Sequence, residues 1–546
     1  MIKRIINNQF KTITAAAVFL GIASLASRFL GLIRDRLLAG TFGAGDELDI
    51  YYAAFRIPDL VYYLLVLGAI SAGFIPVFVD YFKKNKEQSW YLVSSLVNLI
   101  AVFLIGVCLI LIVFAPWLMK MVAPGFSAEK LATTTHLARI MFLSPLLLGI
   151  STIFGGVLQS WRRFFVYALA PIVYNLGIIF SILFLIDRLG LIGLSYGVVL
   201  GAFLHLVIQF IAVVQGGYRW RFVFDWRFKG VKRILKLTPP RFLSLTLNQV
   251  NILAMTIIAS TLAAGSIAVY NLAHNIWSFP LGIFGISFMT ASFPGLAEKA
   301  QKKDLAGFVD IFSSTVRQVL FFILPASALF IVLRAQIVRL ILGTGRFDWQ
   351  DTILTLDTLA YFCLGLFAEA LALLFLRGFF AWEDAKTPFV LGFFAMLIRL
   401  FGAWFFASYL ALGVPGLALG FSVGSVFYLI LLFIALSNKL RRISKRDLPE
   451  LKDSEKRIFT ADMKFLIATF FSAISAYLAL YGIDCLVDTH TGLGLLIQGG
   501  LAGLIGVFVY GFVCWLLRVP ELNTFLSIAW SKLSGKKVVA EISEVE

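Results

Sequence analysis

The run LIAVFLIGVCLILIVFAPWL, from Leu99 to Leu118, holds 20 residues without a charged side chain. A helix needs about 20 apolar residues to cross the hydrocarbon layer of a bilayer. This run lies in a longer apolar stretch at 89–118, and similar stretches follow one another along most of the chain. The pattern predicts an all-α, polytopic membrane protein.

Apolar runs bounded by charge, glycine or proline predict about 14 transmembrane helices. Several exceed the minimal length, which predicts tilt or kinks. The first run is too long for a signal peptide and lacks a small-residue cleavage site. The expected spans are 12–35, 48–80, 89–118, 133–160, 164–186, 190–215, 242–264, 266–297, 307–333, 352–381, 388–410, 414–437, 463–487 and 493–518.

The composition excludes soluble classes of protein. Of the 546 residues, 60% are hydrophobic and 14% charged, whereas soluble domains have about 45–50% and 25%. The net charge of +17 fits cytoplasmic loops facing anionic lipid better than nucleic acid. No metalloprotease, nucleophile-elbow or phosphate-loop motif is present, and the four cysteines and four histidines show no metal-ligand spacing. The cysteines are expected to be packing residues.

Lysine and arginine gather in alternate loops, which predicts an even number of spans with both termini in the cytoplasm. The exception is the ninth connection, where 335–347 is expected to form a short interfacial helix and turn. Two long basic loops divide the chain. The expected domains are an N-terminal lobe at 1–216, a basic cytoplasmic amphipathic linker at 217–241, a C-terminal lobe at 242–437, a charged cytoplasmic loop at 438–462, two further spans at 463–518 and a cytoplasmic tail at 519–546.

Spans two and eight carry prolines at loosely corresponding positions, Pro58 and Pro76 against Pro280 and Pro294. A proline bends a membrane helix and leaves a carbonyl without its usual partner. We therefore expect these prolines to kink two helices that act as gates. Six spans in each half would give both halves the same orientation, with a substrate between them.

Span one carries charge inside its apolar run. Arg28 and Asp35 are seven residues apart and share a helix face, with Arg34 next to them. Charged side chains within the membrane are costly and usually functional. The alternative is that the arginines snorkel or pair with the acids that open span two, namely Asp46, Glu47 and Asp49.

Other polar residues also fall inside predicted spans. For the amides and single histidines, hydrogen bonding between helices is the preferred interpretation. Glu369 has two candidate partners, Arg317 and Arg399. The remaining members of this set are His136, Arg139, Asn175, His205, Asn248, Gln249, Asn251, Asn271, His274 and Asn275.

Ser27–Asp35 (SRFLGLIRD), followed by Phe42–Gly45 (FGAG) and Asp49, resembles the opening of the MurJ (MviN) family of bacterial lipid II flippases. Phe55–Asp59 (FRIPD) resembles the continuation of the same opening. Further matching motifs are Gly68-Ala69, Phe74-Ile75-Pro76, Gly155–Ser160, Arg163-Phe164, Ala170-Pro171 with Asn175, Arg377–Ala381, Asp384 and Lys386-Thr387-Pro388.

The resemblance implies the fold of the multidrug/oligosaccharidyl-lipid/polysaccharide exporters, with two six-helix lobes around a central cationic cavity and two C-terminal helices forming an apolar groove. It implies a transporter that moves undecaprenyl-diphosphate-linked peptidoglycan precursor, lipid II, to the outer leaflet of the bacterial inner membrane by alternating access. Lipid II, membrane lipids and the cell-wall synthesis machinery are the implied partners. No cofactor is expected, although coupling to the membrane potential or an ion fits the family. Some members bind sodium through acids in spans seven and eleven, and those spans hold no carboxylate here.

The resemblance also carries over particular residues. Arg34 and Asp35 match the family's functional Arg-Asp pair, Arg28 matches a further cavity arginine, and Asp49 matches an acid at the entrance of span two. Two positions depart from the family, because Tyr62 and Asn275 stand where the family has arginines. Guanidinium groups bind phosphate in a bidentate manner. The predicted substrate-binding set is therefore Arg28, Arg34, Asp35, Asp49, Arg56, Tyr62, His274 and Asn275.

Other functions stay open on the sequence. A flippase for a different undecaprenyl-diphosphate-linked oligosaccharide, of the O-antigen or capsule type, shares the expected fold, and Tyr62 and Asn275 keep this alternative open. A non-transporting scaffold has the same pattern. A drug or cation antiporter would prefer acidic cavity residues. A membrane glycosyltransferase would need catalytic acids on a sizeable outer loop.

Overall fold

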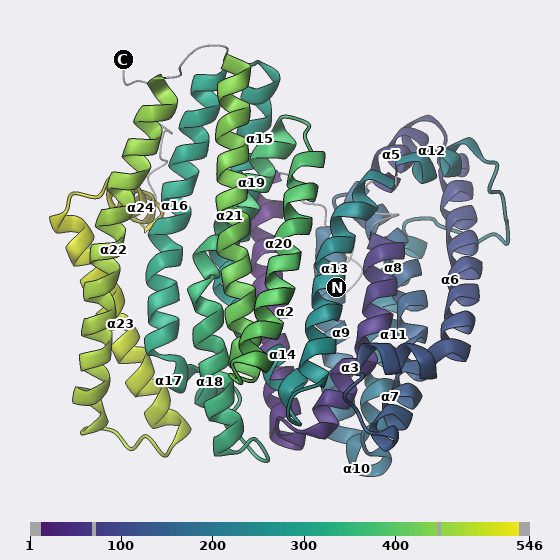
Figure 1. Ribbon diagram of the computed structural model, residues 1–546. Helices are drawn as coiled ribbons and strands as arrows, with labels where there is room; N and C mark the ends of the chain where they lie inside the picture. Colours follow the sequence, from purple (N-terminus) through teal and green to yellow (C-terminus); the bar gives the residue numbers. More distant parts are fainter. Residues whose placement is uncertain (1–12, 68–72, 238, 445–448, 534–546) are drawn as a thin grey trace. The chain divides into compact units, whose positions relative to one another are not determined.

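The computed structural model describes residues 13–67, 73–237, 239–444 and 449–533, with side chains over 19–64, 73–236, 247–444 and 460–527. Every regular element in these ranges is helical, which confirms the predicted all-α class (Figure 1). The predicted cytoplasmic termini, at 1–12 and 534–546, and the matching motif Gly68-Ala69 lie outside the described residues.

The described chain forms two compact units. The first unit holds the residues up to Ile276 together with Ile341–Thr358 and Leu400–Gly420, and the second holds Trp277–Leu340, Leu359–Arg399 and the residues from Phe421 onward. The predicted domain boundaries are a different division, based on loop charge, and stay predictions.

The first unit contains most of the N-terminal helices. Their bounds are α2 (Ile13–Phe42), α3 (Asp46–Val61), η1 (Tyr62–Leu67), α5 (Phe74–Lys84), α6 (Lys86–Val122), α7 (Ala128–Met141), α8 (Leu143–Ser160), α9 (Phe164–Phe184), α10 (Ile186–Leu189), α11 (Ile192–Gln215), α12 (Lys229–Leu237) and α13 (Pro239–Ser260). It also includes η3 (Phe405–Tyr409).

Five helices contribute to both units: α14 (Ser266–Pro280), α17 (Arg334–Ile341), α18 (Trp349–Leu364), α20 (Lys386–Trp404) and α21 (Val414–Ser444). The short α17 confirms the predicted short helix in the ninth connection. The second unit adds η2 (Leu281–Gly285), α15 (Ile286–Gln301), α16 (Leu305–Val332), α19 (Leu366–Ala381), α22 (Pro449–Asp484), α23 (Gly492–Leu516) and α24 (Pro520–Leu533).

Ten helices or continuous helix runs of the described chain are long and apolar enough to cross a membrane. The pair α18 and α19, bent by 44°, adds an eleventh. These eleven coincide with eleven of the predicted spans. The other three, at 12–35, 48–80 and 242–264, include residues or side chains outside the described ranges and stay predictions. The ten are Lys86–Val122, Ala128–Ser160, Phe164–Phe184, Ile192–Gln215, Ser266–Gln301, Leu305–Val332, Lys386–Tyr409, Val414–Ser444, Thr460–Asp484 and Gly492–Leu516.

Polar side chains fix where several helices begin. Asn85 accepts hydrogen bonds from the backbone N–H groups of Glu87 and Gln88 at the start of α6, at 2.8 and 3.1 Å. Asp304 does the same for Gly307 at the start of α16, at 2.9 Å. Such N-caps satisfy N–H groups that have no partner within the helix. The beginnings of α6 and α16 are therefore set by capping side chains, close to where the charged residues bound the predicted spans.

Small residues bring α9 and α11 into backbone contact within the first unit. A methyl group on Gly177 would lie 2.4 Å from the Cα of Gly201, and one on Gly197 would lie 1.9 Å from the hydroxyl of Ser181. Gly177 and Ser181 are four residues apart, as are Gly197 and Gly201. Small residues at this spacing let membrane helices approach closely, because little hydrophobic force acts between helices in lipid.

Two of the predicted kink prolines lie in helices that continue directly into π-helical segments. Pro58 lies in the last turns of α3, which continues into η1. Pro280 ends α14, and η2 begins at the next residue. A proline removes a backbone donor, and π-helical turns often mark such sites in membrane helices. Pro76 instead lies in the first turn of α5, where a missing N–H costs little, and Pro294 lies inside α15.

The linker at 217–241 differs from the prediction of one amphipathic helix, since only Lys229–Leu237 is helical in the described part. The preceding segment is extended and follows the polar face of α6. Asn98 donates to the carbonyls of Arg221 and Val223, both at 2.9 Å, and accepts from the Trp220 indole. The aromatic side chains of this segment are exposed at every second position from Trp220 to Trp226, whereas Tyr218 is buried. That period of two belongs to an extended chain.

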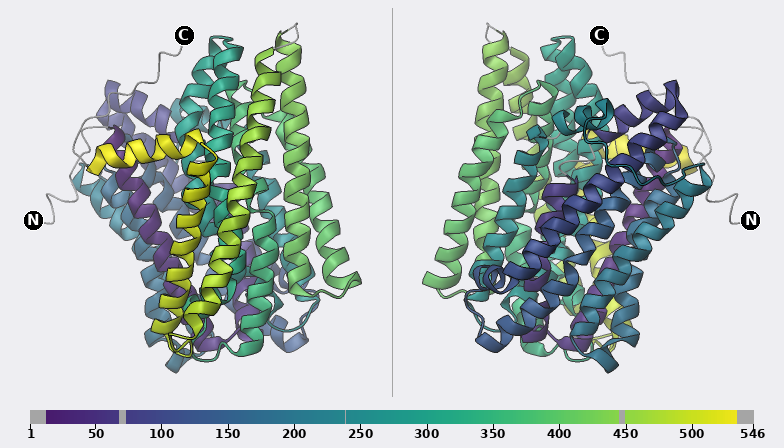
Figure 2. Two further views of the ribbon diagram at one scale, coloured as in Figure 1. Left: turned by 90° about the vertical axis from the view of Figure 1, so that its left-hand side faces the viewer. Right: turned by 90° about the vertical axis from the view of Figure 1, so that its right-hand side faces the viewer.

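The two last membrane helices pack on α16 within the second unit. The rings of Phe321 and Phe465 lie 5.8 Å apart, and the Tyr510 hydroxyl donates to the carbonyl of Phe321 at 2.7 Å. The left view of Figure 2 shows α24 running across the end of α23. Three of the cysteines are buried as expected, but Cys485 is exposed, so its predicted packing role was wrong.

Candidate functional site

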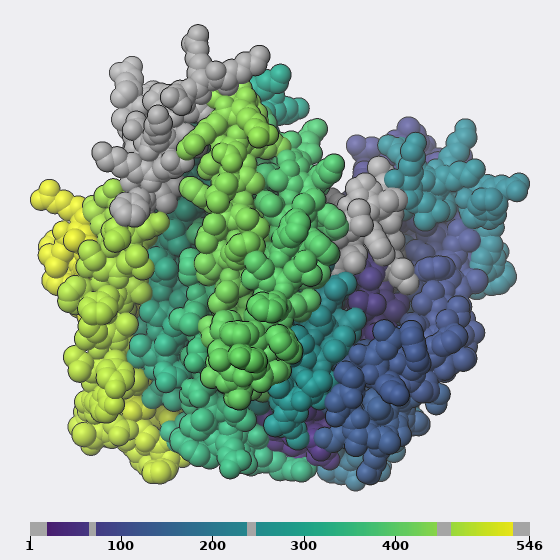
Figure 3. Space-filling view, viewed as in Figure 1, coloured from purple at the N-terminus to yellow at the C-terminus, as the bar shows by residue number. Residues whose placement is uncertain are grey.

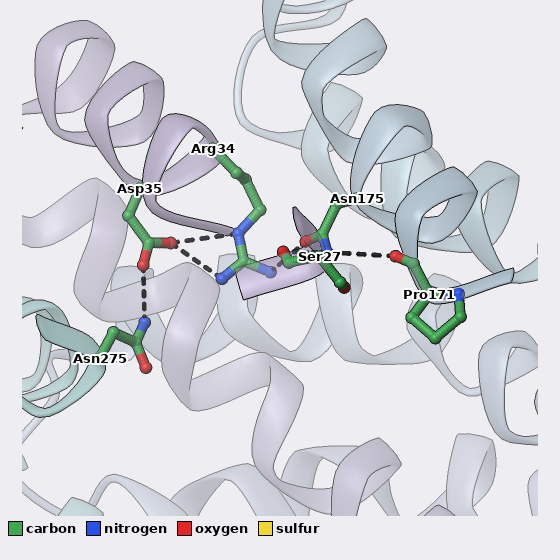
Figure 4. Close-up of polar contacts among 6 residues, drawn as sticks. All are labelled: Ser27, Arg34, Asp35, Pro171, Asn175 and Asn275. Atoms are coloured by element: carbon green, nitrogen blue, oxygen red, sulfur yellow. Dashed lines mark hydrogen bonds and ion pairs between the residues drawn. The ribbon is translucent and has the colours of Figure 1, made fainter. Parts of the chain in front are cut away.

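The charged pair in span one forms an ion pair within a single helix. Arg34 Nε and Nη2 both donate to Asp35 Oδ1, at 3.1 and 2.9 Å (Figure 4). The Asp35 side chain is buried, with 4% exposed, and the Arg34 side chain keeps 22% of its surface exposed. Adjacent residues point in different directions from a helix, so the arginine has to fold back to reach its neighbour.

Two asparagines from other helices complete this cluster. Arg34 Nη1 donates to Asn175 Oδ1 at 3.1 Å, and Asn275 Nδ2 donates to Asp35 Oδ2 at 2.8 Å. Figure 4 shows Asn175 and Asn275 approaching the pair from opposite sides. Asn175 is oriented by its own bond to the carbonyl of Pro171, at 3.1 Å. Helices α2, α9 and α14 thus meet at one polar centre, which confirms the predicted interhelical role of Asn175.

The centre leaves hydrogen-bonding capacity on the guanidinium. Arg34 has five N–H donors, and bonds to the described residues use three of them. Both oxygens of Asp35 accept hydrogen bonds. The unused donors and the exposed part of the side chain belong to Arg34, so an incoming anion can bind there without breaking the pair.

A second arginine of the first unit connects three helices. Arg56 on α3 donates from Nε to the Thr256 hydroxyl of α13, at 2.7 Å, and from Nη2 to the Asn271 carbonyl oxygen of α14. Asp59, one turn further along α3, interacts electrostatically with both Arg56 and Arg34. Asp59 thus joins the candidate site, although the sequence placed it only within a motif, and its position one turn from Arg56 was the available signal.

Asp49, in the first turn of α3, binds the N-terminus of another helix, α14. Its two carboxylate oxygens accept from the backbone N–H groups of Gly265 and Ala268, at 2.7 and 2.8 Å. A carboxylate at a helix N-terminus is stabilised by unpaired N–H groups and the helix dipole. Gly265 has φ +86°, and a methyl group there would clash with the Ala44 carbonyl. A substrate contact by Asp49 stays a prediction.

The acids that open α3 have partners other than the span-one arginines. Asp46 pairs with Lys130, and Glu47 pairs with Arg346 at 3.0 Å. They stand in the first turn of α3, as predicted. The alternative in which Arg34 pairs with these acids was therefore wrong.

Three further predicted substrate-binding residues, Arg28, Tyr62 and His274, lie on α2, η1 and α14. Arg28 is half-buried on α2, six residues before Arg34. Tyr62 opens η1 and packs edge-on against Tyr63, with ring centroids 5.5 Å apart. His274 stacks on Tyr270 at 6.3 Å. A substrate-binding role for these three residues stays a prediction.

In the second unit, Glu369 pairs with Arg399. Arg399 Nη2 donates to Glu369 Oε2 at 2.7 Å and to the Ser425 hydroxyl at 2.9 Å. Arg317 pairs instead with Glu521, at 2.8 Å. Sequence analysis named the candidates but could not choose between them.

Comparison with known proteins identifies the family. The profile described as "Lipid II flippase MurJ" matches residues 38–484. The chain belongs to the lipid II flippase MurJ family. A probable lipid II flippase MurJ of Buchnera aphidicola (Acyrthosiphon pisum) is 27% identical over 513 residues, which cover 93% of this chain and 98% of the relative. A member of the MurJ family is a transporter rather than an enzyme, and this chain is accordingly a multi-pass membrane transporter.

Solved structures agree with the MurJ fold. A lipid II flippase MurJ in an inward closed conformation superposes with a TM-score of 0.74 at 23% identity, covering 92% of this chain and 98% of that chain. An inward-facing MATE family transporter of the MOP superfamily gives 0.66 at 15% identity, over 77% of this chain and 96% of that one. These likenesses concern the fold, and they confirm the predicted fold.

Proposed function

We propose that this chain moves lipid II from the inner to the outer leaflet of a bacterial inner membrane by alternating access. The proposal includes cytoplasmic termini, as loop charge predicts. The observation that carries it is the Arg34 centre, an arginine of a membrane helix with donors left over after its partners are satisfied.

The physical need of the reaction explains this centre. A diphosphate carries negative charge across about 30 Å of hydrocarbon, so it needs cationic donors held in the protein. Guanidinium binds phosphate through parallel N–H bonds. Asp35 and Asn175 fix the orientation of Arg34 and so reduce the entropy lost on binding.

The Asp35 carboxylate also limits affinity. It offsets part of the positive charge of Arg34, and Asn275 in turn holds Asp35 at 2.8 Å. A transporter has to release its substrate, so a partly neutralised cation suits the task better than an isolated one. We place Arg28, Arg56 and His274 as supporting polar contacts for the head group, with the π-helical segments after Pro58 and Pro280 as the bending points.

The prenyl tail needs no polar site. We propose that it stays in lipid along the outward surfaces of α22 and α23, where Phe470, Leu478, Leu504 and Phe508 are exposed. Exposed apolar side chains on membrane helices contact acyl chains at little cost.

The test is rescue of a bacterium depleted of its own lipid II flippase. Expression of this chain should restore growth and the surface exposure of lipid II, measured by its accessibility to an added outer-face probe. Growth without surface exposure, or exposure of an O-antigen or capsule precursor in its place, would contradict the assignment of lipid II as substrate. A chain that binds lipid II without exposing it would favour the scaffold.

A further inference from the structure

A pocket of about 290 Å³ lies in the second unit between α16, α19, α21 and the membrane-spanning part of α22. Its walls are mainly aliphatic and aromatic, with Val316, Leu320, Phe375 and Leu436 among them. In Figure 3, α16 is visible as a narrow teal column between α21 and α22. This size is near the lower end of small-ligand sites, which are usually about 300–1,000 Å³.

The pocket opens toward lipid. Ile430 and Phe433 line it and are 50% and 44% exposed on α21, a helix that is long and apolar enough to span the membrane. Apolar side chains exposed on such a helix face acyl chains. An alkyl chain can therefore enter from the bilayer without crossing water.

The pocket extends from the end of the spans toward the middle of the membrane. It reaches from Val309 to Leu320 on α16, and eleven residues of helix cover about 16 Å. That length is about half of the 30 Å hydrocarbon layer. Val309 lies near the beginning of the span Leu305–Val332, and Leu440 lies near the end of Val414–Ser444. Both mark the same end of the pocket.

A carboxylate stands at this end. Asp462 lines the pocket and stands just before the apolar run of α22 that begins after Lys464, which places it near the depth of lipid head groups. Its Oδ1 is buried and has no hydrogen-bond partner among the described residues. A buried acceptor without a donor is costly, so a donor from a ligand would be stabilising.

The charges beside Asp462 favour a cation. Arg317 interacts electrostatically with Asp462 but is already paired with Glu521, at 2.8 Å. Glu521 Oε2 is likewise buried without a partner among the described residues. Two carboxylates share one guanidinium, so this group of three carries a net charge of −1 when both acids are ionised. A phosphate alone would be repelled, whereas an ammonium group would be attracted.

From these features we infer that the pocket binds one acyl chain of a zwitterionic phospholipid with a primary amine, whose ammonium group donates to Asp462. The amine supplies three N–H donors. A quaternary ammonium has the charge but no donor, and a glycerol head group leaves the phosphate uncompensated. This lipid is a bound partner and not the cargo, so the inference goes beyond the proposed function.

The test measures lipid binding to the full chain in detergent by native mass spectrometry. Phosphatidylethanolamine, phosphatidylcholine and phosphatidylglycerol with identical acyl chains are added separately. We expect phosphatidylethanolamine to bind about tenfold more tightly than the other two, as one charge-assisted hydrogen bond predicts. Equal binding of the three lipids by the unaltered chain would overturn the inference without any variant.

Variants locate the binding. Asp462→Asn keeps the size of the side chain and should remove the tenfold preference, because the amide lacks the charge. Asp484→Asn is the matched control on the same helix, since Asp484 already accepts from Gln498 Nε2 at 3.0 Å. It should keep the preference. Ser437→Phe should fill the pocket and weaken the binding of all three lipids. A preference that survives in folded Asp462→Asn protein would refute the assignment.

Discussion

Two arginines within helices, Arg34 on α2 in the first unit and Arg399 on α20 in the second, have different surroundings. Arg399 takes its carboxylate from another helix, donates to Ser425, and lies over the Phe421 ring at 4.6 Å. Its side chain is 11% exposed. Arg34 takes its carboxylate from the next residue of its own helix and is 22% exposed.

The difference favours a structural role for Arg399 and agrees with the functional role that we propose for Arg34. The Arg399 pair joins α20 to α19, so breaking it would leave a charge unpaired between packed helices. The Arg34–Asp35 pair joins nothing, since one helix carries both groups. Among the described residues, Asn175 and Asn275 connect it to α9 and α14 by hydrogen bonds, and Asp59 on α3 interacts electrostatically with Arg34. A buried arginine therefore does not indicate function by itself. It also matters whether its carboxylate partner lies on the same helix or on another one.

The largest effect is expected from Glu369→Leu. It leaves Arg399 without its carboxylate and should lower the free energy of unfolding by about 3–5 kcal/mol. The double variant Glu369→Leu/Arg399→Met removes both charges and should recover most of that loss. Chemical denaturation in detergent micelles measures both. A double variant as unstable as the single one would show that the pair is not the source of the stability.

Arg34→Ala should impair transport and leave stability nearly unchanged, in contrast to the loss of stability expected for Glu369→Leu. Loss of two charge-assisted contacts to the head group predicts about 100-fold slower lipid II exposure, with an unfolding free energy close to that of the unaltered chain. The readouts are surface exposure of lipid II and denaturation of the same preparation. Full transport by Arg34→Ala would remove Arg34 from the mechanism.

A smaller contrast is expected from the neutral partners. Asn275→Ala leaves Asp35 Oδ2 without its donor and should slow lipid II exposure about tenfold, because an unsatisfied acceptor costs about 1–3 kcal/mol. Ser425→Ala is the matched change beside Arg399. It should cost stability of about 1 kcal/mol and leave transport unchanged. Equal transport by the two variants would contradict the separation.

The smallest effect concerns an exposed ion pair at the end of a span, between Lys299 and Asp304, of which Asp304 lies outside the spans. Hydrogen bonds from Lys299, at 2.7 Å, and from the Gly307 backbone lower the pKa of Asp304 below its usual value. A lowered folded-state pKa means that the stabilisation is complete above the usual pKa of about 3.9. It is lost as the pH falls through the lowered value.

Asp304→Asn should therefore unfold at nearly the same temperature as the unaltered chain below the lowered pKa. It should unfold at a slightly lower temperature at neutral pH. Thermal unfolding between pH 2 and 7 measures the difference. A difference that grows toward low pH would have the wrong sign.

Much of the fold could be predicted because hydrophobic length is a local property. The run Leu99–Leu118 predicts a membrane span from its own length and hydrophobicity, whatever helices pack against it. The linker segment at 218–228 was predicted wrongly because bases interleaved with aromatics also suit an amphipathic helix. Its extended form depends on Asn98, more than 100 residues earlier.

The site could be predicted only in part for the same reason. Arg34 and Asp35 were visible as charge within an apolar run, which is again local. Asn175 lies 141 residues from Arg34, and Asn275 lies 240 residues from Asp35. The sequence holds several other amides within predicted spans, and the packing of α2 with α9 and α14 determines which of them reach the ion pair. The choice between Arg317 and Arg399 for Glu369 depended in the same way on tertiary contacts.

The thiol of Cys485 has a practical consequence. All four cysteines fall within the described ranges, and three of them are buried while Cys485 is exposed. A maleimide reagent should therefore modify this position selectively in the native protein. The unaltered chain carries a ready attachment point for a fluorophore or spin label at the end of α22, with which distance changes during a transport cycle can be followed.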